Sequence, residues 1–386
     1  SLEEVSLVGS SIPNGTFRSC KKLSKVYNSK DISNLGNFAF YGCENLQDFR
    51  FSENLKLIPN SAFERCKNLV SIVLPNGITR IGKKAFYSCN NISVFNLPAC
   101  LEFIGSEALK YCNSITKLCI PSNLNALGQQ AFSYMSSLKL LEVDPQNRTF
   151  ISPDGISLID KNLQTFILYA NGSELKSYSL ESYCLHMDIF DREIINPITR
   201  IDKFAFAGSN NLETLTLCSC TIDIEYNSFN DCNNLKTLKI KTIPMYSTFG
   251  IRLRNNGTYF LDSKDNVSLF PFETVEIDDQ LRGLEIHAFA GCKKLKHLNL
   301  ENSKLAYIRR MAFEECKDLS TVFINTNISE IDERAFADST LIKFENGFEI
   351  LSKDLKILRT INGIRIYSTN TGINYIEANN QIVEIT

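Results

Sequence analysis

Histidine is scarce in this 386-residue chain, which has only three. They are His186, His287 and His297. A Ser-His-Asp or Cys-His site needs a base held beside a nucleophile, and no such local signature occurs. The phosphate-loop and H-E-x-x-H motifs are also missing from the sequence. We therefore interpret His287 and His297 as variable surface residues, and we predict no enzymatic activity, no catalytic or cofactor-binding residues, no cofactor and no metal site.

The chain also lacks an excess of charge of either sign. Its formal net charge is -2 and its pI is about 6.1. This balance argues against nucleic acid or an anionic membrane as the main partner. No apolar run approaches the roughly 18 residues that a membrane helix needs, so we expect no direct membrane insertion.

An initiator methionine and an export signal are missing as well. The sequence opens at Ser1, and Leu2, Val5 and Leu7 already have the spacing of a repeat strand. We expect that the native N-terminus, with any export signal, has been removed from this chain.

What the sequence has in abundance is a repeat of 23 residues. Its aromatic position reads Phe17, Phe40, Phe63, Phe86, Leu109 and Phe132, and the pattern returns at Phe206, Phe229, Phe289, Phe313 and Phe336. These positions define eleven recognisable units, arranged as six, then two, then three. Such a repeat predicts a solenoid of stacked coils, none of which can bury its apolar side alone.

Each repeat has two halves. Leu69-x-x-Ile72-x-Leu74 matches the strand of leucine-rich repeats, and successive coils would add such strands in parallel at about 4.8 Å to form one long curved sheet. The Ala-Phe-x-x-Cys half has helical spacing over one or two turns, and it predicts a short helix or turn on the convex side. The expected class is therefore α/β but β-rich: a right-handed leucine-rich-repeat solenoid with a curved parallel sheet, short convex helices or turns, and inserted β-hairpins.

Two segments interrupt the array. They are residues 144–200 and 241–271 of a predicted solenoid that spans residues 1–344. Asp154-Gly155 and Asp160-Lys161-Asn162 lie between apolar alternations and predict hairpin turns. Similar turns recur at residues 261–265 and 351–355. Residues 345–386 predict a β-rich C-terminal cap that covers the last coil.

The repeat resembles the BspA-type (Treponema pallidum-type) leucine-rich repeats. Residues 81–98 carry that pattern in Ile81, Gly82, Ala85, Phe86, Cys89, Ile92, Phe95, Leu97 and Pro98. The segment around Asn147, Phe150, Ser152, Asp154 and Gly155 is similar to the N-x-x-[FY]-x-S-x-D-G segment that interrupts arrays of this family. The departures, Leu109, Met135, Ser209 and Pro59, are conservative for packing.

The resemblance covers residues 2–344, with weak matching in residues 181–198 and 241–271. It implies a cell-surface or secreted protein, of the kind that bacteria and anaerobic protists use to adhere to host proteins or other cells. It implies no catalytic residues.

Cysteine is plentiful, with 13 residues. Eight of them occupy one repeat position: Cys20, Cys43, Cys66, Cys89, Cys112, Cys232, Cys292 and Cys316. Free cysteine behaves as a small buried hydrophobe, and Met135 fills the same position, so we predict packing. Ladder disulfides are disfavoured because neighbouring Cβ atoms would lie too far apart with parallel vectors. Cys218-x-Cys220 lacks zinc-ribbon spacing.

Outward strand positions remain as the candidate binding surface, on the predicted concave face. One row reads Tyr27, Arg50, Val73, Asn96, Cys119 and Glu142, then Thr216, Lys239, Asn299 and Phe323. Extended sheets are the usual binding surfaces of solenoids, so we select Arg50, Val73, Asn96, Glu142 and Lys239 as candidate partner-binding residues. The alternative is that the row is only solvated sheet and that binding lies on the inserted hairpins or outside this chain.

Two functions remain open at this point. The first is a non-enzymatic adhesion or binding module, monomeric, which recognises a protein or glycan of a host or neighbouring cell. The second is a structural spacer that presents another domain away from the cell surface. Sequons stand at Asn14, Asn91, Asn147, Asn171, Asn256, Asn266 and Asn327, and they do not decide between the two.

Overall fold

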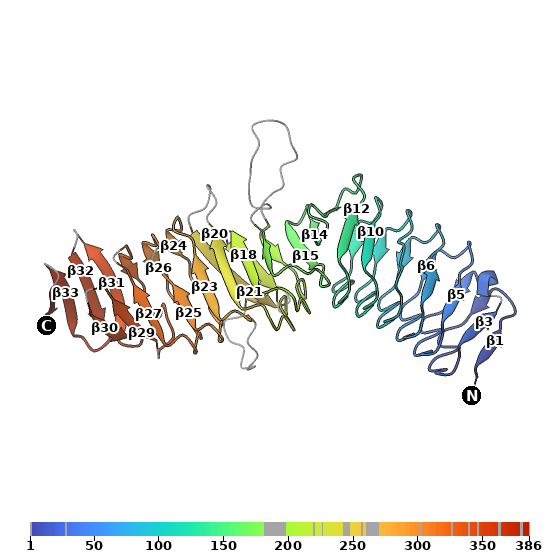
Figure 1. Ribbon diagram of the computed structural model, residues 1–386, viewed down its shortest axis with the longest axis horizontal. Helices are drawn as coiled ribbons and strands as arrows, with labels where there is room; N and C mark the ends of the chain where they lie inside the picture. The colour runs from blue at the N-terminus through green and yellow to red at the C-terminus, as the bar shows by residue number, and fades with distance from the viewer. Residues whose placement is uncertain are drawn as a thin grey trace. The chain divides into compact units, whose positions relative to one another are not determined.

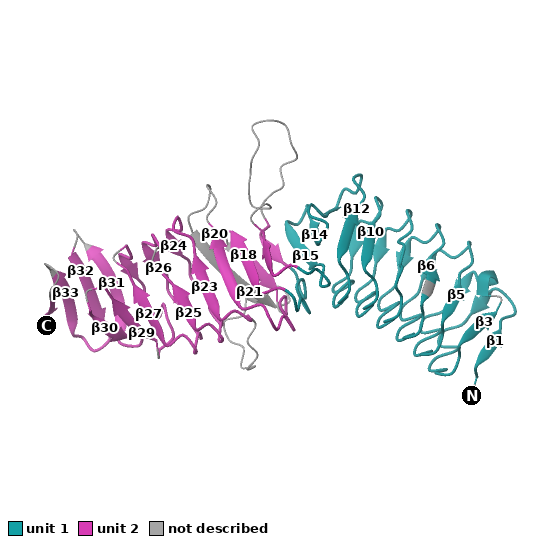
Figure 2. Ribbon diagram, in the orientation of Figure 1, with its two compact units in different colours: residues 1–174, 202–211 teal, residues 175–201, 212–386 magenta. Residues whose placement is uncertain are grey.

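The computed structural model describes most of the chain. The described residues are 2–27, 29–180, 198–218, 221–225, 227–241, 248–255, 258–259, 270–300, 303–325, 327–338, 340–345, 347–361, 364–378 and 381–385. They form two compact units (Figure 2): unit 1 comprises Ser1–Glu174 and Asp202–Asn211, and unit 2 comprises Leu175–Ile201 and Leu212–Thr386.

Unit 1 is a stack of coils whose short strands form two parallel ladders, each with breaks in its pairing; the coil between residues 82 and 102 has no strand in the first ladder (Figure 1). The first ladder contains β1 (Glu4–Ser6), β3 (Lys25–Tyr27), β5 (Asp48–Arg50), β7 (Ser71–Val73), β10 (Lys117–Ile120) and β12 (Leu140–Val143). The second contains β2 (Ser11–Ile12), β4 (Asn34–Leu35), β6 (Leu57–Ile58), β8 (Arg80–Ile81), β9 (Phe103–Ile104) and β11 (Ala126–Leu127). The first ladder is the predicted L-x-x-I-x-L strand. The second was not predicted.

The interior of unit 1 is a file of stacked rings. The rings of Phe63 and Phe86 are 5.5 Å apart at 5°, and Phe17–Phe40 and Phe40–Phe63 repeat this contact at 5.2 and 5.4 Å. Phe132, two coils further on, is 3% exposed. The predicted inward alignment of the aromatic position is therefore confirmed. Each coil covers the apolar face of its neighbour, which is how a stack of coils becomes stable where one coil alone would not be.

The Ala-Phe-x-x-Cys half forms turns, so of the predicted short helix or turn the helix was wrong. The only helix in the described part of the chain is the single 3-10 turn η1 (Ser29–Asp31). Around Phe86, the residues two before and two after it, Lys84 and Ser88, have φ of 55° and 57°. A left-handed residue on each side of the aromatic prevents an α-helix.

Hydrogen bonds between coils impose this geometry. The backbone N–H groups of Lys84, Phe86 and Ser88 donate to carbonyls of the next coil at 2.8–3.0 Å. The intervening N–H groups of Tyr87 and Cys89 bond within the coil, to the carbonyls three residues earlier. The alternation ties each turn to its neighbour along the stack, whereas a helix would use every N–H internally.

Unit 1 also contains antiparallel strands within the first predicted insertion. They are β13 (Phe150–Ile151), β14 (Ser157–Asp160) and β15 (Thr165–Tyr169). β14 pairs with both of its neighbours, so the two predicted hairpin turns are confirmed. The carboxylate of Asp154 accepts the backbone N–H groups of Ile156 and Ser157 at 3.0 and 2.9 Å, which fixes the first turn.

Unit 2 repeats the two-ladder plan. Its first ladder contains β16 (Ser177–Ser179), β18 (Thr214–Cys218), β20 (Thr237–Lys241), β23 (Thr274–Ile277), β25 (His297–Asn299), β27 (Thr321–Ile324), β29 (Leu341–Phe344) and β30 (Glu349–Leu351). Its second contains β17 (Arg200–Ile201), β19 (Thr221–Glu225), β21 (Thr248–Asn255), β24 (Gly283–Leu284), β26 (Tyr307–Ile308) and β28 (Glu330–Ile331). Two strands at their edges pair antiparallel: β30 with β29, and β22 (Thr258–Tyr259) with β21. β20 pairs in parallel with β23, so register is kept across the second interruption.

The last strands of unit 2 run antiparallel. They are β31 (Leu355–Ile361), β32 (Ile364–Thr369), β33 (Asn374–Ala378) and β34 (Gln381–Ile385). β31 pairs antiparallel with β28, which ends the parallel ladder, and the buried guanidinium of Arg365 donates to the carbonyl of Asn325 in the coil below at 3.1 Å. The strands give residues 345–386 the predicted β character, while the domain boundary at residue 344 stays a proposal.

Two predicted turns had different outcomes. The turn at residues 261–265 lies outside the described residues. The turn at residues 351–355 is present, but it joins β30 to β31, which belong to different sheets, so it does not close a β-hairpin as predicted.

Candidate binding surface

The outward side chains of the first ladder form what we call the strand face. In unit 1 every member of the predicted row is exposed. These are Tyr27, Arg50, Val73, Asn96, Cys119 and Glu142. Val73 is 78% exposed, although the inward residues beside it, Ile72 and Leu74, are buried. The alternation along the strand therefore places the row on the surface, as the sequence predicts.

In unit 2 the row is less uniform. Thr216 is only 9% exposed, so its predicted outward exposure was wrong; Lys239 is half-buried, and Asn299 and Phe323 are exposed. The register also places Glu276 between Lys239 and Asn299, a member of the row that the sequence reasoning missed.

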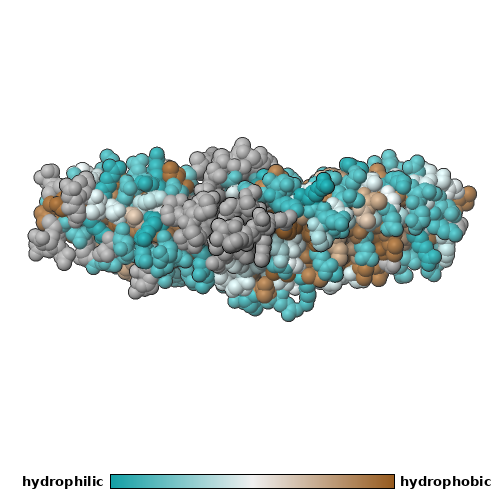
Figure 3. All heavy atoms as spheres, turned by 90° about the horizontal axis from the view of Figure 1, so that it is seen from above, coloured by the Kyte–Doolittle hydropathy of each residue, from teal (hydrophilic) through white to brown (hydrophobic). Residues whose placement is uncertain are grey.

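Ion pairs between adjacent strands join opposite charges on this face in both units. Lys117 lies 2.7 Å from Glu142 and Lys239 lies 2.7 Å from Glu276. The hydrogen bond from Lys117 lowers the pKa of Glu142. Of the predicted residues, Arg50 and Val73 are register partners on neighbouring strands. Lys239 belongs to the other unit. On the side of the molecule seen in Figure 3, the surface is mostly hydrophilic with small separate hydrophobic groups.

Cys119 is the one thiol in this row. Its sulfur lies 3.5 Å from a carboxylate oxygen of Glu142. Partial burial, together with the hydrogen bond to Glu142, raises the pKa of Cys119. A thiol with a raised pKa stays protonated at neutral pH and is not an activated nucleophile.

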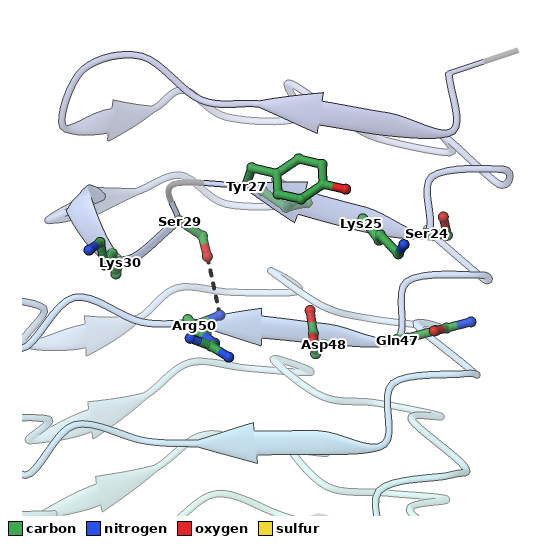
Figure 4. A pocket seen from close by; sticks show the side chains of 9 residues that line it. Ser24, Lys25, Tyr27, Ser29, Lys30, Gln47, Asp48 and Arg50 are labelled. Carbon is green, nitrogen blue, oxygen red and sulfur yellow. Dashed lines mark hydrogen bonds between the residues drawn. The ribbon is translucent and has the colours of Figure 1, made fainter.

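A shallow groove opens in the strand face near the N-terminus. It has a volume of about 400 Å³ and lies between β3 and β5, which carry no ladder pairing with each other (Figure 4). The Ser29 hydroxyl accepts the backbone N–H of Arg50 at 3.2 Å, taking the place of a strand carbonyl. Tyr27 and Lys25 stand on one wall, and both contact the Glu4 carboxylate, at 3.1 and 3.6 Å.

A second groove, of about 600 Å³, lies at the corresponding position in unit 2, between β25 and β27. Phe323 is on its wall and is 68% exposed. We call these the N-terminal groove and the C-terminal groove. Both lie where neighbouring strands of the first ladder are not paired with each other.

The sequence carried weak signals for both grooves. Phe289 and Phe313 are 24 residues apart, one more than the repeat, and the extra residue falls in the coil between β25 and β27. At the N-terminal groove, Asn28 stands at a repeat position that holds Phe51 and Leu74 in the next two coils. Neither deviation was interpreted in the prediction.

The repeat cysteines line the interior, as predicted. Seven of the eight are buried and Cys20 is half-buried. Thiols donate to the backbone carbonyl of a Phe in the preceding coil, for example Cys66 to Phe40 at 3.1 Å. Cys218 is buried, whereas Cys220 lies outside the described residues. Every described cysteine is a free thiol.

Among the residues that the structure describes, no group of three His, Cys, Asp or Glu side chains could hold a metal ion. His287 is half-buried and His297 is exposed. In the same residues, no helix is long and apolar enough to cross a membrane.

A parallel solenoid whose coils carry L-x-x-I-x-L strands defines a leucine-rich repeat protein. The family model described as a BspA type leucine-rich repeat region, with six copies, matches residues 10–139, 174–249 and 268–385. The chain belongs to this family. None of the curated proteins matches it.

Solved structures share the fold at low identity. A leucine-rich cell surface protein from Faecalibacterium prausnitzii A2-165 is 19% identical, with a TM-score of 0.51 over 82% of this chain and 86% of that chain. A leucine-rich repeat protein from Eubacterium ventriosum is 19% identical, with a TM-score of 0.53 over 88% and 90%. The pneumococcal vaccine antigen PcpA is 19% identical, with a TM-score of 0.52 over 89% and 74%.

Proposed function

We propose that this protein is a non-enzymatic binding and adhesion module, at the cell surface or secreted, that recognises a protein or glycan partner through its strand face. The observation that carries the proposal is the contrast within one strand: Ile72 and Leu74 are buried in the stack, while Val73 between them is 78% exposed. The stack needs the inward residues, and the outward row is left for recognition.

Two further observations support this function. The strand face has a groove in each unit, and each groove exposes a residue of the predicted row, Arg50 or Phe323. The surface location is supported by family membership and by the description of the Faecalibacterium prausnitzii protein as a cell surface protein.

A binding screen with row variants tests the proposal. The purified protein is applied to arrays of extracellular-matrix proteins and of glycans, and the strongest partner is titrated against alanine variants of Arg50, Asn96, Glu142 and Lys239. Lys22→Ala and Glu53→Ala serve as controls because both residues are exposed and lie outside the row. Weaker binding in the row variants alone is expected. Equal affinity in all variants would contradict the strand face as the binding surface and would favour the inserted hairpins.

A further inference from the structure

The C-terminal groove has a structural origin that sets its chemistry. β25 pairs with β23, and β27 pairs with β29, but β25 and β27 lie side by side without ladder pairing (Figure 1). The sheet is therefore interrupted between β25 and β27, although each of these strands pairs with its other neighbour.

The opening exposes an inward side chain. Leu298 on β25 is the register partner of Val275 on β23. Val275 is completely buried, whereas Leu298 is only half-buried and lines the groove. The floor of the groove is thus apolar, although the strand face around it is polar.

Phe323 forms the wall beside this floor. Its neighbours along β27, Val322 and Ile324, are buried at 1%, so the strand is well packed, and the ring of Phe323 is nevertheless 68% exposed. No other aromatic ring stacks on it in the described part of the chain. One face of an aromatic ring is available to a ligand.

The rim of the groove is polar, its two lysines are paired with acidic residues, and the exposed Glu345 adds a carboxylate, so the rim disfavours an anionic ligand. Lys343, the register partner of Phe323, is 2.7 Å from Glu349, and Lys296 is 3.1 Å from Glu273. Asn299 and Thr321 add an amide and a hydroxyl to the lining. The N-terminal groove differs, because Lys30 and Arg50 both line it as cations.

We propose that the C-terminal groove binds a neutral oligosaccharide, with one pyranose ring stacked on Phe323. The face of a pyranose is a patch of C–H groups, which the negative face of an aromatic ring attracts, and its edge carries hydroxyls that need donors and acceptors. A volume of about 600 Å³ is typical of small-ligand sites. This inference rests on the proposed function, to which it adds the class of partner.

A protein partner fits the groove less well. Protein interfaces bury about 800 Å² on each side and have cores depleted of charged residues. Here the exposed aromatic side chain is single, and its direct neighbour across the strands is the Lys343–Glu349 ion pair. A protein covering Phe323 would have to bury that ion pair, at a cost in desolvation.

Ligand-observed NMR and calorimetry on the whole chain test the proposal. The probes are cellotriose, maltotriose and tri-N-acetylchitotriose as neutral sugars and 3′-sialyllactose as an acidic one, each up to about 10 mM, which detects millimolar affinities. Phe323→Ala is compared with Ile286→Ala, a control because Ile286 is an exposed apolar residue of the same unit that lies outside the strand face and outside the groove. Phe323→Tyr keeps the ring, and circular dichroism checks each fold.

We expect a neutral sugar to bind, with an affinity that falls at least about tenfold in Phe323→Ala and is kept in Ile286→Ala and Phe323→Tyr. Binding of no neutral sugar, a preference for the acidic sugar, or equal affinity in Phe323→Ala would overturn the inference. None of these results would exclude the proposed function. A partner from the array screen whose binding depends on Arg50 or Glu142 would still support it.

Discussion

The thiol of Cys89 donates a hydrogen bond to the backbone carbonyl of Phe63, with a sulfur–oxygen distance of 3.0 Å. The two residues belong to successive coils, and the same bond recurs from Cys43 to Phe17 and from Cys112 to Phe86. The repeat cysteine therefore fills the interior and also gives a second hydrogen bond to a carbonyl of the neighbouring coil that already accepts a backbone N–H. Two properties of this position lead to measurable consequences.

The first consequence is a dependence of stability on alkaline pH. Burial raises the pKa of Cys112 from 9.0 to about 12. Between these values the unfolded thiol loses its proton and the folded thiol keeps it, so the unfolded state binds fewer protons and the free energy of unfolding falls as pH rises. Below pH 9 this contribution is fully present. Each such group contributes a slope of up to about 1.4 kcal/mol per pH unit.

Urea unfolding of wild type and Cys112→Ala at several alkaline pH values checks this slope. The variant should lose free energy less steeply with pH than wild type. Cys100→Ala, which changes an exposed thiol, should keep the wild-type slope. Parallel curves for wild type and Cys112→Ala would contradict the assignment.

The second consequence concerns thiol reactivity. Cys100 and Cys119 are exposed, whereas Cys66 and Cys89 are buried and burial raises the pKa of both. Iodoacetamide reacts with accessible thiolates, so native protein should be alkylated at Cys100 and Cys119 well before Cys66 and Cys89. Peptide mass spectrometry over a time course identifies the sites. If Cys66 in the native protein were alkylated as fast as Cys119, the reagent would be reaching the interior of the stack. That result would contradict the burial of Cys66.

A buried asparagine should make a large contribution to stability. Asn147 is 2% exposed, and its amide donates to the carbonyls of Pro121 and Leu124 at 2.7 and 2.9 Å while its oxygen accepts the N–H of Phe150 at 2.7 Å. Asn147→Asp removes both donors, so the Leu124 carbonyl loses its amide partner and a carboxylate is buried against two carbonyl oxygens, at a cost of about 2–4 kcal/mol. Chemical unfolding measures the loss, and Asn96→Asp on the exposed row is the control. Equal stability of the two variants would refute the structural role of Asn147.

The stacking of the coils could be predicted from the repeat, whereas the backbone conformation of the turns could not. Phe63 and Phe86 recur at the same repeat position because they pack on each other, so their contact is encoded locally in each coil. The helix prediction failed because Lys84 and Ser88 carry no local sign of positive φ. Their conformation is set by hydrogen bonds to the next coil, which are long-range interactions that outweigh helical spacing.

The outward position of the candidate surface residues was also predictable, because it is encoded within each strand. Alternation along a strand places Arg50 and Val73 outward from the sequence alone. The two grooves depend on which neighbouring strands pair, and a missing pairing between β25 and β27 shows in the sequence only as one additional residue. The exposure of Leu298 follows from that missing pairing and has no sequence signal of its own.

The most direct test of the shared interior compares two aspartate substitutions in adjacent coils. Phe86 is completely buried and stacked between coils, whereas Val73 is 78% exposed on the strand face. Phe86→Asp places an unpaired charge inside the stack and should lower the free energy of unfolding by at least about 3 kcal/mol, while Val73→Asp should change it by less than about 0.5 kcal/mol. Equal unfolding midpoints for the two variants in urea would contradict the account.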